Sequence, residues 1–196
     1  MNFPLTLRFK VVALAPQIYV EDAAGNTVCY VKQKMLRLKE KIEVFQDSSR
    51  QQLLATIDAD RIIDWSARYH FTAESGQELG SVGRRGMRSL WRAHYEIVLP
   101  GSDTPAMTLR EENPWTKVMD GFFGELPIIN LFSGYLFHPK YLVSRNDGTP
   151  VMRLTKEPAF WEGRFKVDLL SEVSPQEQLT LTLSGLMMLL LERRRG

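Results

Sequence analysis

The sequence predicts a mainly β domain, a wide antiparallel β-barrel closed around a hydrophobic C-terminal helix. Three observations predict this class. Short segments of β-branched and aromatic residues alternate with turn residues from position 5 to about 170, an apolar helical segment follows, and the chain of 196 residues is long enough to bury a sizeable core. We expect one domain over residues 1–196, because no Gly, Pro or Ser-rich linker interrupts the chain.

The strand segments follow one another in order, with polar turns between them. The clearest hairpin is centred on Asn146-Asp147-Gly148, since Asp-Gly supplies the positive φ that tight hairpin turns require. Around 42–57, polar and apolar residues alternate on either side of a polar loop, which is typical of two half-buried strands. The predicted strands cover 5–13, 17–22, 27–33, 42–44, 53–57, 65–72, 78–84, 94–99, 141–144, 151–154 and 165–170.

The C-terminal segment has the pattern of a helix over about 175–194. Ser174-Pro175-Gln176-Glu177 is a capping box with proline at the first helical position. From Leu179 to Leu191 no side chain is charged, so the helix is apolar on every side and has to be buried in protein or lipid. Thirteen residues span only about 20 Å, less than the hydrocarbon core of a bilayer, which favours burial within the barrel.

The overall charge of the chain excludes wholesale nucleic-acid binding. The net charge is +2 with a pI near 8.7, so any charged partner has to be met by a local cluster. Cys29, the single cysteine, lies in a strand pattern and is expected to be a buried apolar residue. The first ten residues alternate like a strand and do not resemble a signal peptide. We therefore expect a cytoplasmic protein, with a peripheral membrane position left open.

These features together resemble the tubby C-terminal-like superfamily, and within it the LURP-one-related and phospholipid scramblase-like proteins. The resemblance covers roughly residues 25–100 and the terminal helix. It rests on Tyr30-Val31-Lys32-Gln33-Lys34, on KIEVFQDSSRQQLLATI at 41–57, on the hairpin from Trp65 through Leu79-Gly80-Ser81-Val82-Gly83-Arg84-Arg85, and on Trp91-Arg92-Ala93-His94-Tyr95-Glu96-Ile97.

The resemblance implies a closed barrel of about twelve antiparallel strands threaded by the C-terminal helix, and no enzyme chemistry. Tubby-like proteins are similar in binding phosphoinositide headgroups, and scramblase-like proteins act at phospholipid membranes. This chain lacks the Pro-rich N-terminal region, cysteine cluster and acidic calcium segment of the scramblases, so scrambling activity is not carried over. No tubby headgroup residue is assigned to a position here.

Two basic clusters are the main candidates for binding anionic lipid or another phosphorylated ligand. On a strand, alternate residues share a face, so members of a cluster can point together at phosphates. The alternative is that they form a solvated strand face or protect a strand edge. The clusters consist of Lys32, Lys34, Arg37, Lys39 and Lys41, and of Arg84, Arg85, Arg88 and Arg92.

Two further motifs have competing interpretations. The spacing of Gly80, Gly83 and Gly86 lacks the features of a P-loop or a dinucleotide site, so we interpret these residues as turn glycines at a strand end. The segment 115–141 is rich in aromatic residues and glycines, which suits insertion at a lipid interface or binding of a partner, or else a loop folded onto the barrel. Its candidate residues are Trp115, Phe122, Phe123, Phe132 and Tyr135.

No pattern indicates catalysis, a metal or a cofactor. His70, His94 and His138 are scattered without the spacing of metal ligands, and no Gly-x-Ser-x-Gly motif is present. The sequence therefore predicts a non-enzymatic module that binds anionic phospholipid headgroups or another phosphorylated ligand. The alternatives are a protein-interaction domain that uses the aromatic segment and a membrane-attached protein with a short C-terminal anchor.

Overall fold

The computed structural model describes residues 1–10, 17–32, 41–60, 67–84, 94–112, 139–159 and 162–193. These residues form twelve strands and one helix, α3 (Pro175–Arg193). The strands are β1 (Leu5–Lys10), β2 (Gln17–Glu21), β3 (Thr27–Lys32), β4 (Ile42–Phe45), β5 (Leu53–Ala59), β6 (Arg68–Ala73), β7 (Glu78–Arg84), β8 (His94–Val98), β9 (Met107–Glu111), β10 (Lys140–Arg145), β11 (Pro150–Glu157) and β12 (Glu162–Leu169).

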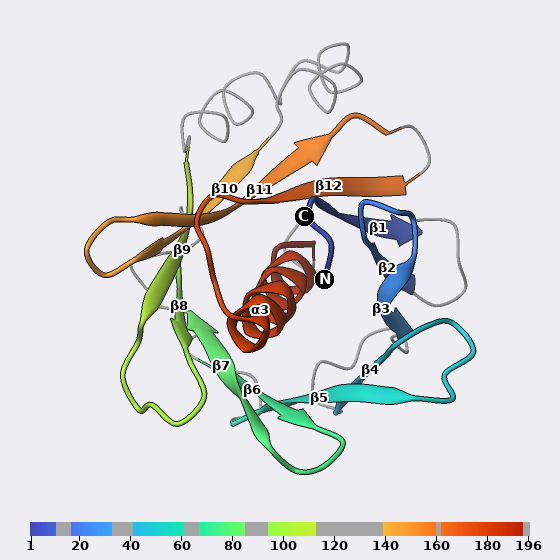
Figure 1. Ribbon diagram of the computed structural model, residues 1–196, viewed down its shortest axis with the longest axis horizontal. Helices are drawn as coiled ribbons and strands as arrows, with labels where there is room; N and C mark the ends of the chain where they lie inside the picture. Colours follow the sequence, from blue (N-terminus) through green and yellow to red (C-terminus); the bar gives the residue numbers. More distant parts are fainter. Residues whose placement is uncertain are drawn as a thin grey trace, which may run out of the picture.

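The twelve strands form one closed antiparallel barrel, as the sequence predicts. Each strand pairs with its neighbours in the chain, and β1 pairs with β12 from Leu5↔Val167 to Lys10↔Glu162, which closes the ring. Figure 1 shows α3 at the centre of this ring. Closure of the ring leaves the sheet without a free edge. A barrel of twelve strands encloses a wide interior, which α3 fills.

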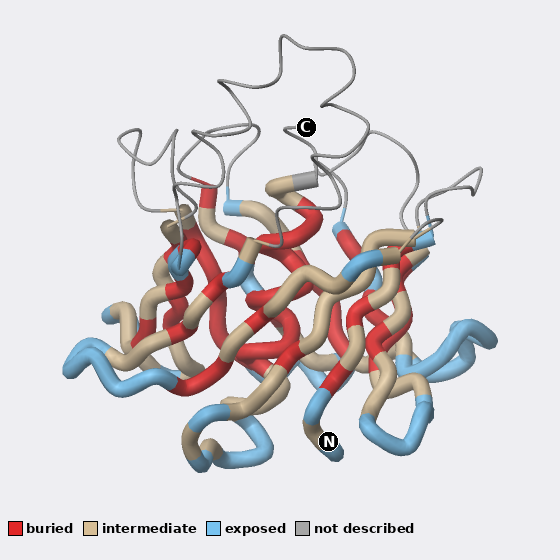
Figure 2. Tube along the Cα trace, turned by 90° about the horizontal axis from the view of Figure 1, so that it is seen from above, coloured by how far each residue is buried: buried red, intermediate tan, exposed pale blue. Residues whose placement is uncertain are grey.

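The two ends of the barrel differ in which strands finish there. Because every pair of neighbouring strands is antiparallel, strands finish alternately at one end and at the other. At the lower end, short turns join the strands and α3 begins at Pro175. At the upper end, β1, β3, β5, β7, β9 and β11 finish and α3 ends at Arg193. Figure 2 shows the lower end at the bottom, where exposed turns surround the N-terminus.

Side chains on the strands alternate between the core and the outer wall. In β1, Leu5 and Leu7 are buried while Thr6 and Arg8 face outward, and the same period of two recurs around the barrel. The inward side chains meet the apolar surface of α3 in one continuous hydrophobic cluster. The alternation seen in the sequence therefore marks the inner wall of the barrel.

The helix α3 begins at the predicted capping box and is buried along most of its length. The Ser174 amide donates to Glu177 Oε2 at 2.9 Å, and the Glu177 amide donates to Ser174 Oγ at 3.2 Å. The hydroxyls of Thr182 and Ser184 donate to backbone carbonyls four residues earlier, each at 2.7 Å, so these buried polar groups are satisfied within the helix. No helix in the described part of the chain is long and apolar enough to cross a bilayer.

The helix α3 packs closely against β7 at Gly80, where any side chain on the strand would prevent the contact. Gly80 faces α3, and a Cβ atom on Gly80 would lie 2.5 Å from the Val98 carbonyl oxygen and 2.9 Å from Thr180 Cγ2. The Thr180 hydroxyl donates to the Leu79 carbonyl across the same contact. Gly80 and Gly83 thus lie inside a strand, and their interpretation as turn glycines is wrong. Gly80 lets the backbones of β7 and α3 approach each other, whereas Gly83 faces the outer wall beside Arg68, and Gly86 lies outside the described residues.

Cys29 is a buried, inward-facing residue of β3, and desolvation raises the pKa of its thiol to about 12. Above pH 9 the thiol ionises in the unfolded chain but stays protonated in the folded one, so thiol titration lowers stability as pH rises. We expect the free energy of unfolding in urea, measured from pH 8 to 10, to fall more steeply than in Cys29→Ala, by up to about 1.4 kcal/mol per pH unit. Equal slopes would contradict burial of the thiol.

Candidate functional site

Four exposed cations surround the upper end of the barrel at the ends of their strands. We call Lys10, Lys32, Arg110 and Lys140 the rim cations. None of them forms an ion pair with a carboxylate in the described part of the chain, although Lys10 Nζ lies 5.0 Å from the centre of the Tyr19 ring. The rim cations share this end with several carboxylates, so the described rim carries both signs of charge. They are Glu43, Asp58, Asp60, Glu111, Glu112, Glu157 and Glu162.

Three of the nine predicted basic residues lie in the described part of the chain. Lys32 is exposed at the end of β3, and Lys41, which precedes β4, has its Nζ 3.7 Å from Asp58 Oδ2. Arg84 lies on the inward register of β7, opposite Tyr95 and with its guanidinium carbon 5.9 Å from the centre of the Tyr95 ring. All three are at the upper end. The predicted residues Lys34, Arg37, Lys39, Arg85, Arg88 and Arg92 lie outside the described residues, as do Trp115, Phe122, Phe123, Phe132 and Tyr135.

The cations on the outer wall differ from the rim cations because they are balanced by carboxylates. Arg8 bonds to Glu21 and also faces Glu162, which in turn accepts a 2.7 Å bond from Arg164. Arg153 binds Glu112 through two nitrogens, at 2.9 and 3.0 Å. Because these charges neutralise one another, the wall between the two ends is a poor place for an anionic ligand.

The lower end is acidic. Its bases are Arg50 and Arg145, and Arg145 Nη1 lies 3.4 Å from Glu177 Oε1. In the turns, hydrogen bonds to the carboxylates lower the pKa of Asp22, Asp47 and Asp147, so these groups stay charged. The donors are chiefly the Asn26 amide for Asp22, the hydroxyl and then the amide of Ser49 for Asp47, and the Thr149 amide for Asp147. The lower-end carboxylates are Asp22, Asp47, Glu74, Glu78, Asp103, Asp147 and Glu172.

Inside the upper end, several polar side chains point toward the last turn of α3. The Tyr95 hydroxyl donates to Glu192 Oε1 at 2.8 Å, which links β8 to the end of the helix. Tyr141 of β10 is buried nearby, and desolvation together with the carboxylates of Glu192 and Glu111 raises the pKa of its phenol. Tyr141 is therefore a protonated hydrogen-bond donor at neutral pH. Sequence reasoning missed this inner cluster, because strands far apart in the chain contribute to it.

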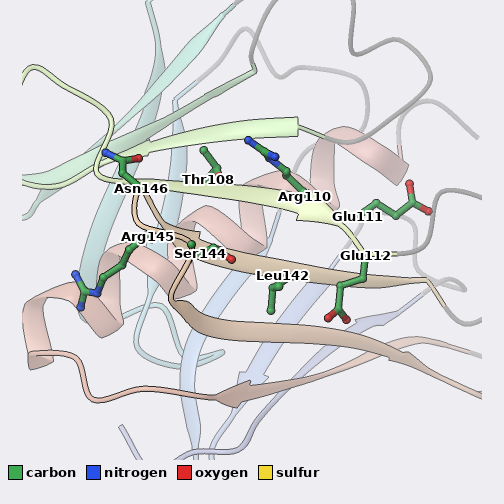
Figure 3. Close-up of a pocket in the computed structure, with 9 residues that line it drawn as sticks. Thr108, Arg110, Glu111, Glu112, Leu142, Ser144, Arg145 and Asn146 are labelled. Carbon is green, nitrogen blue, oxygen red and sulfur yellow. The ribbon is translucent and has the colours of Figure 1, made fainter.

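A groove of about 630 Å³ lies on the outer face of β9 and β10. Figure 3 shows Arg110 and Arg145 in separate parts of this groove, and the strand register agrees, since Arg110 is opposite Leu142 whereas Arg145 is opposite Met107. Glu111 and Glu112 also line it. Two guanidinium groups that do not converge, with carboxylates beside them, make a poor clamp for phosphate.

The fold and its upper end define a closed barrel filled by its own helix, with cations at the rim and a polar inner cluster. The chain belongs to the LURP-one-related family, whose model matches residues 27–173. This confirms the resemblance drawn from the sequence. An X-ray structure of a protein from Arabidopsis thaliana is similar to this chain at 11% identity with a TM-score of 0.49, covering 98% of this chain and 93% of the other. No curated protein matches the sequence.

Proposed function

We propose that the protein is a non-enzymatic module that binds anionic phospholipid headgroups at the cytoplasmic surface of a membrane, with its upper end toward the lipid. The observation that supports this most strongly is the separation of charge along the barrel axis. The lower end carries almost only carboxylates, whereas the rim cations lie at the upper end. An anionic surface repels the acidic lower end more strongly than the upper end, where both signs of charge occur, which favours an orientation with the upper end toward the lipid.

The connections between strands add to this separation. Segments 33–40 and 85–93 join strands whose described ends lie at the upper end, and both are basic in sequence. Each Lys or Arg near an anionic bilayer contributes about 1 kcal/mol. Segment 113–138, which joins β9 to β10, carries the predicted aromatic residues, and aromatic rings favour the headgroup level of a membrane.

The proposal predicts salt-sensitive binding to anionic vesicles. In co-sedimentation at low salt, we expect Lys32→Gln combined with Arg110→Gln and Lys140→Gln to weaken binding to phosphatidylserine-containing vesicles by about 3 kcal/mol, roughly a hundredfold. Binding of the unmodified protein is expected to fall as salt rises, because exposed charges are screened. Arg84 is left unchanged in this test, since it faces the barrel interior.

A matched control neutralises charge at the other end. Asp47→Asn with Asp147→Asn keeps an oxygen that can accept the turn hydrogen bonds, and it is expected to leave vesicle binding unchanged or stronger. Equal binding to neutral and anionic vesicles, regardless of salt, would contradict headgroup recognition and favour insertion of an apolar segment. Failure to bind either vesicle would contradict the proposal and favour the protein-interaction alternative.

A further inference from the structure

A second cavity, of about 250 Å³, lies inside the upper end of the barrel beside the last turn of α3. Its apolar wall consists of Phe9 of β1, Phe165 of β12 and Leu189 of the helix. The two phenyl rings pack edge to face, with their centres 6.1 Å apart. The cavity is partly open to solvent, and it is lined by β1, β10, β11, β12 and α3, which the closure of the barrel brings together.

Gly163 explains why there is space at this position. It lies on the inward register of β12, opposite Phe9, where other inward positions carry large side chains such as Val167. A Cβ atom on Gly163 would lie 3.6 Å from Phe9 Cβ, an ordinary van der Waals contact. The backbone therefore does not require glycine here, and the missing side chain leaves room in the cavity.

Among the described residues that line the cavity, the polar side chains are two donors and one carboxylate. Lys156 is on the inward register of β11, opposite Phe165, and forms no ion pair with any carboxylate in the described part of the chain. Glu192 already accepts the hydrogen bond from Tyr95. Tyr141 contributes a phenol that stays protonated, as described above. Lys156 is half-buried, and its ammonium group can donate hydrogen bonds to an acceptor in the cavity.

We infer that this cavity binds a single apolar chain whose carboxylate or ester carbonyl accepts hydrogen bonds from Lys156 and Tyr141. The volume fits one chain and no more, since a cavity of about 150 Å³ holds benzene and drug-sized ligands need about 300 Å³ or more. The chain can come from a free fatty acid or from one acyl chain of a phospholipid. The inference does not depend on the proposed function, because a free fatty acid needs no membrane.

The test is a calorimetric titration of the full chain with sodium decanoate below its micellar concentration and without vesicles. We expect saturable binding at one site. Lys156→Met keeps the aliphatic volume and removes the charge, so it should weaken decanoate binding about tenfold and leave 1-decanol binding unchanged. The matched control is Lys166→Met, which removes a lysine from the outward face of the neighbouring strand β12 and should change neither ligand.

Filling the cavity is the second arm of the test. Gly163→Val should weaken both decanoate and 1-decanol, and Gly163→Ala gives a smaller effect in the same direction if the valine variant fails to fold. Absence of saturable binding, or equal decanoate affinity in the unmodified chain, Lys156→Met and Gly163→Ala, would overturn the inference. Stronger binding of a lysophospholipid with one decanoyl chain than of decanoate would assign the chain to a phospholipid, and the reverse to a free fatty acid.

The experiments distinguish failure of the headgroup-binding proposal from failure of the apolar-chain proposal. The decanoate titration contains no lipid surface, so its outcome is unaffected by loss of headgroup binding. Lys156→Met leaves the four rim cations in place and should co-sediment with anionic vesicles as the unmodified protein does, unless the cavity takes its chain from the bilayer. In that case the lysophospholipid binds more strongly than decanoate.

Discussion

A chain that ends before Pro175 is expected to lose cooperative folding. Residues from Thr180 to Leu190 are buried, and they cover the inner faces of the strands around the ring. Without α3 those faces would surround a space that no other described element fills, and side chains such as Leu154 and Met152 would lose their contacts at Gly185 and its neighbours. The expected loss exceeds the whole stability of an ordinary domain, about 5–15 kcal/mol.

The near-ultraviolet circular dichroism and thermal melting of the truncated chain test this expectation. Leu186→Asp in the full chain should act in the same direction, because it places a charge in the core, whereas Leu186→Met should cost less than about 1.5 kcal/mol. A truncated chain with a sharp melting transition would show that the helix is dispensable. That result would favour the alternative in which it serves as a terminal anchor.

Gly80→Ala is expected to lower the free energy of unfolding by about 3–4 kcal/mol. Two costs add at this position. The φ of Gly80 is +107°, which L side chains rarely adopt, and a Cβ atom would collide with the Val98 carbonyl and Thr180 Cγ2. Because β7 and α3 would have to separate, the bond from Thr180 to the Leu79 carbonyl should be lost as well.

The variant Gly76→Ala separates the backbone cost of a positive φ from the steric cost of an added Cβ atom. Gly76 has a similar φ of +86°, but a Cβ atom there would meet no atom within 4 Å. Only the backbone cost of about 1–2 kcal/mol should appear. Urea unfolding of both variants gives the comparison, and equal losses would mean that the close approach of α3 to β7 contributes nothing to stability.

Most of the fold was predictable because its signals are local. The capping box at Ser174 and Glu177, the turn at Asp147-Gly148 and the period of two in the strands each depend on residues close in sequence. The closure of the barrel around the helix followed from one further argument. A helix that is apolar all round has to be enclosed, and strands with one apolar face provide the enclosure.

The features that sequence reasoning missed depend on contacts between distant segments. The strand Met107–Glu111 was not among the predicted strands, because Met, Leu, Arg and Glu favour helices and its strand conformation comes from pairing with β8 and β10. Gly80 of β7 looks like a turn residue until α3 is placed beside it. Likewise, the inner cluster of Tyr95, Tyr141 and Glu192 exists only after the barrel has closed. Whether each basic residue is exposed or buried also depends on how distant strands pack together, so the sequence alone did not predict it.

The position of α3 also has a consequence for how the protein is made. All twelve strands precede the helix in the chain, so during synthesis the ribosome releases every hairpin before it releases the segment that fills them. Neighbouring hairpins can pair early, because their contacts are local. The pairing of β1 with β12 and the arrival of the helix have to wait until all the other strands have been made. We expect nascent chains to expose the apolar inner faces of the strands until then, and exposed apolar surface of this kind promotes aggregation.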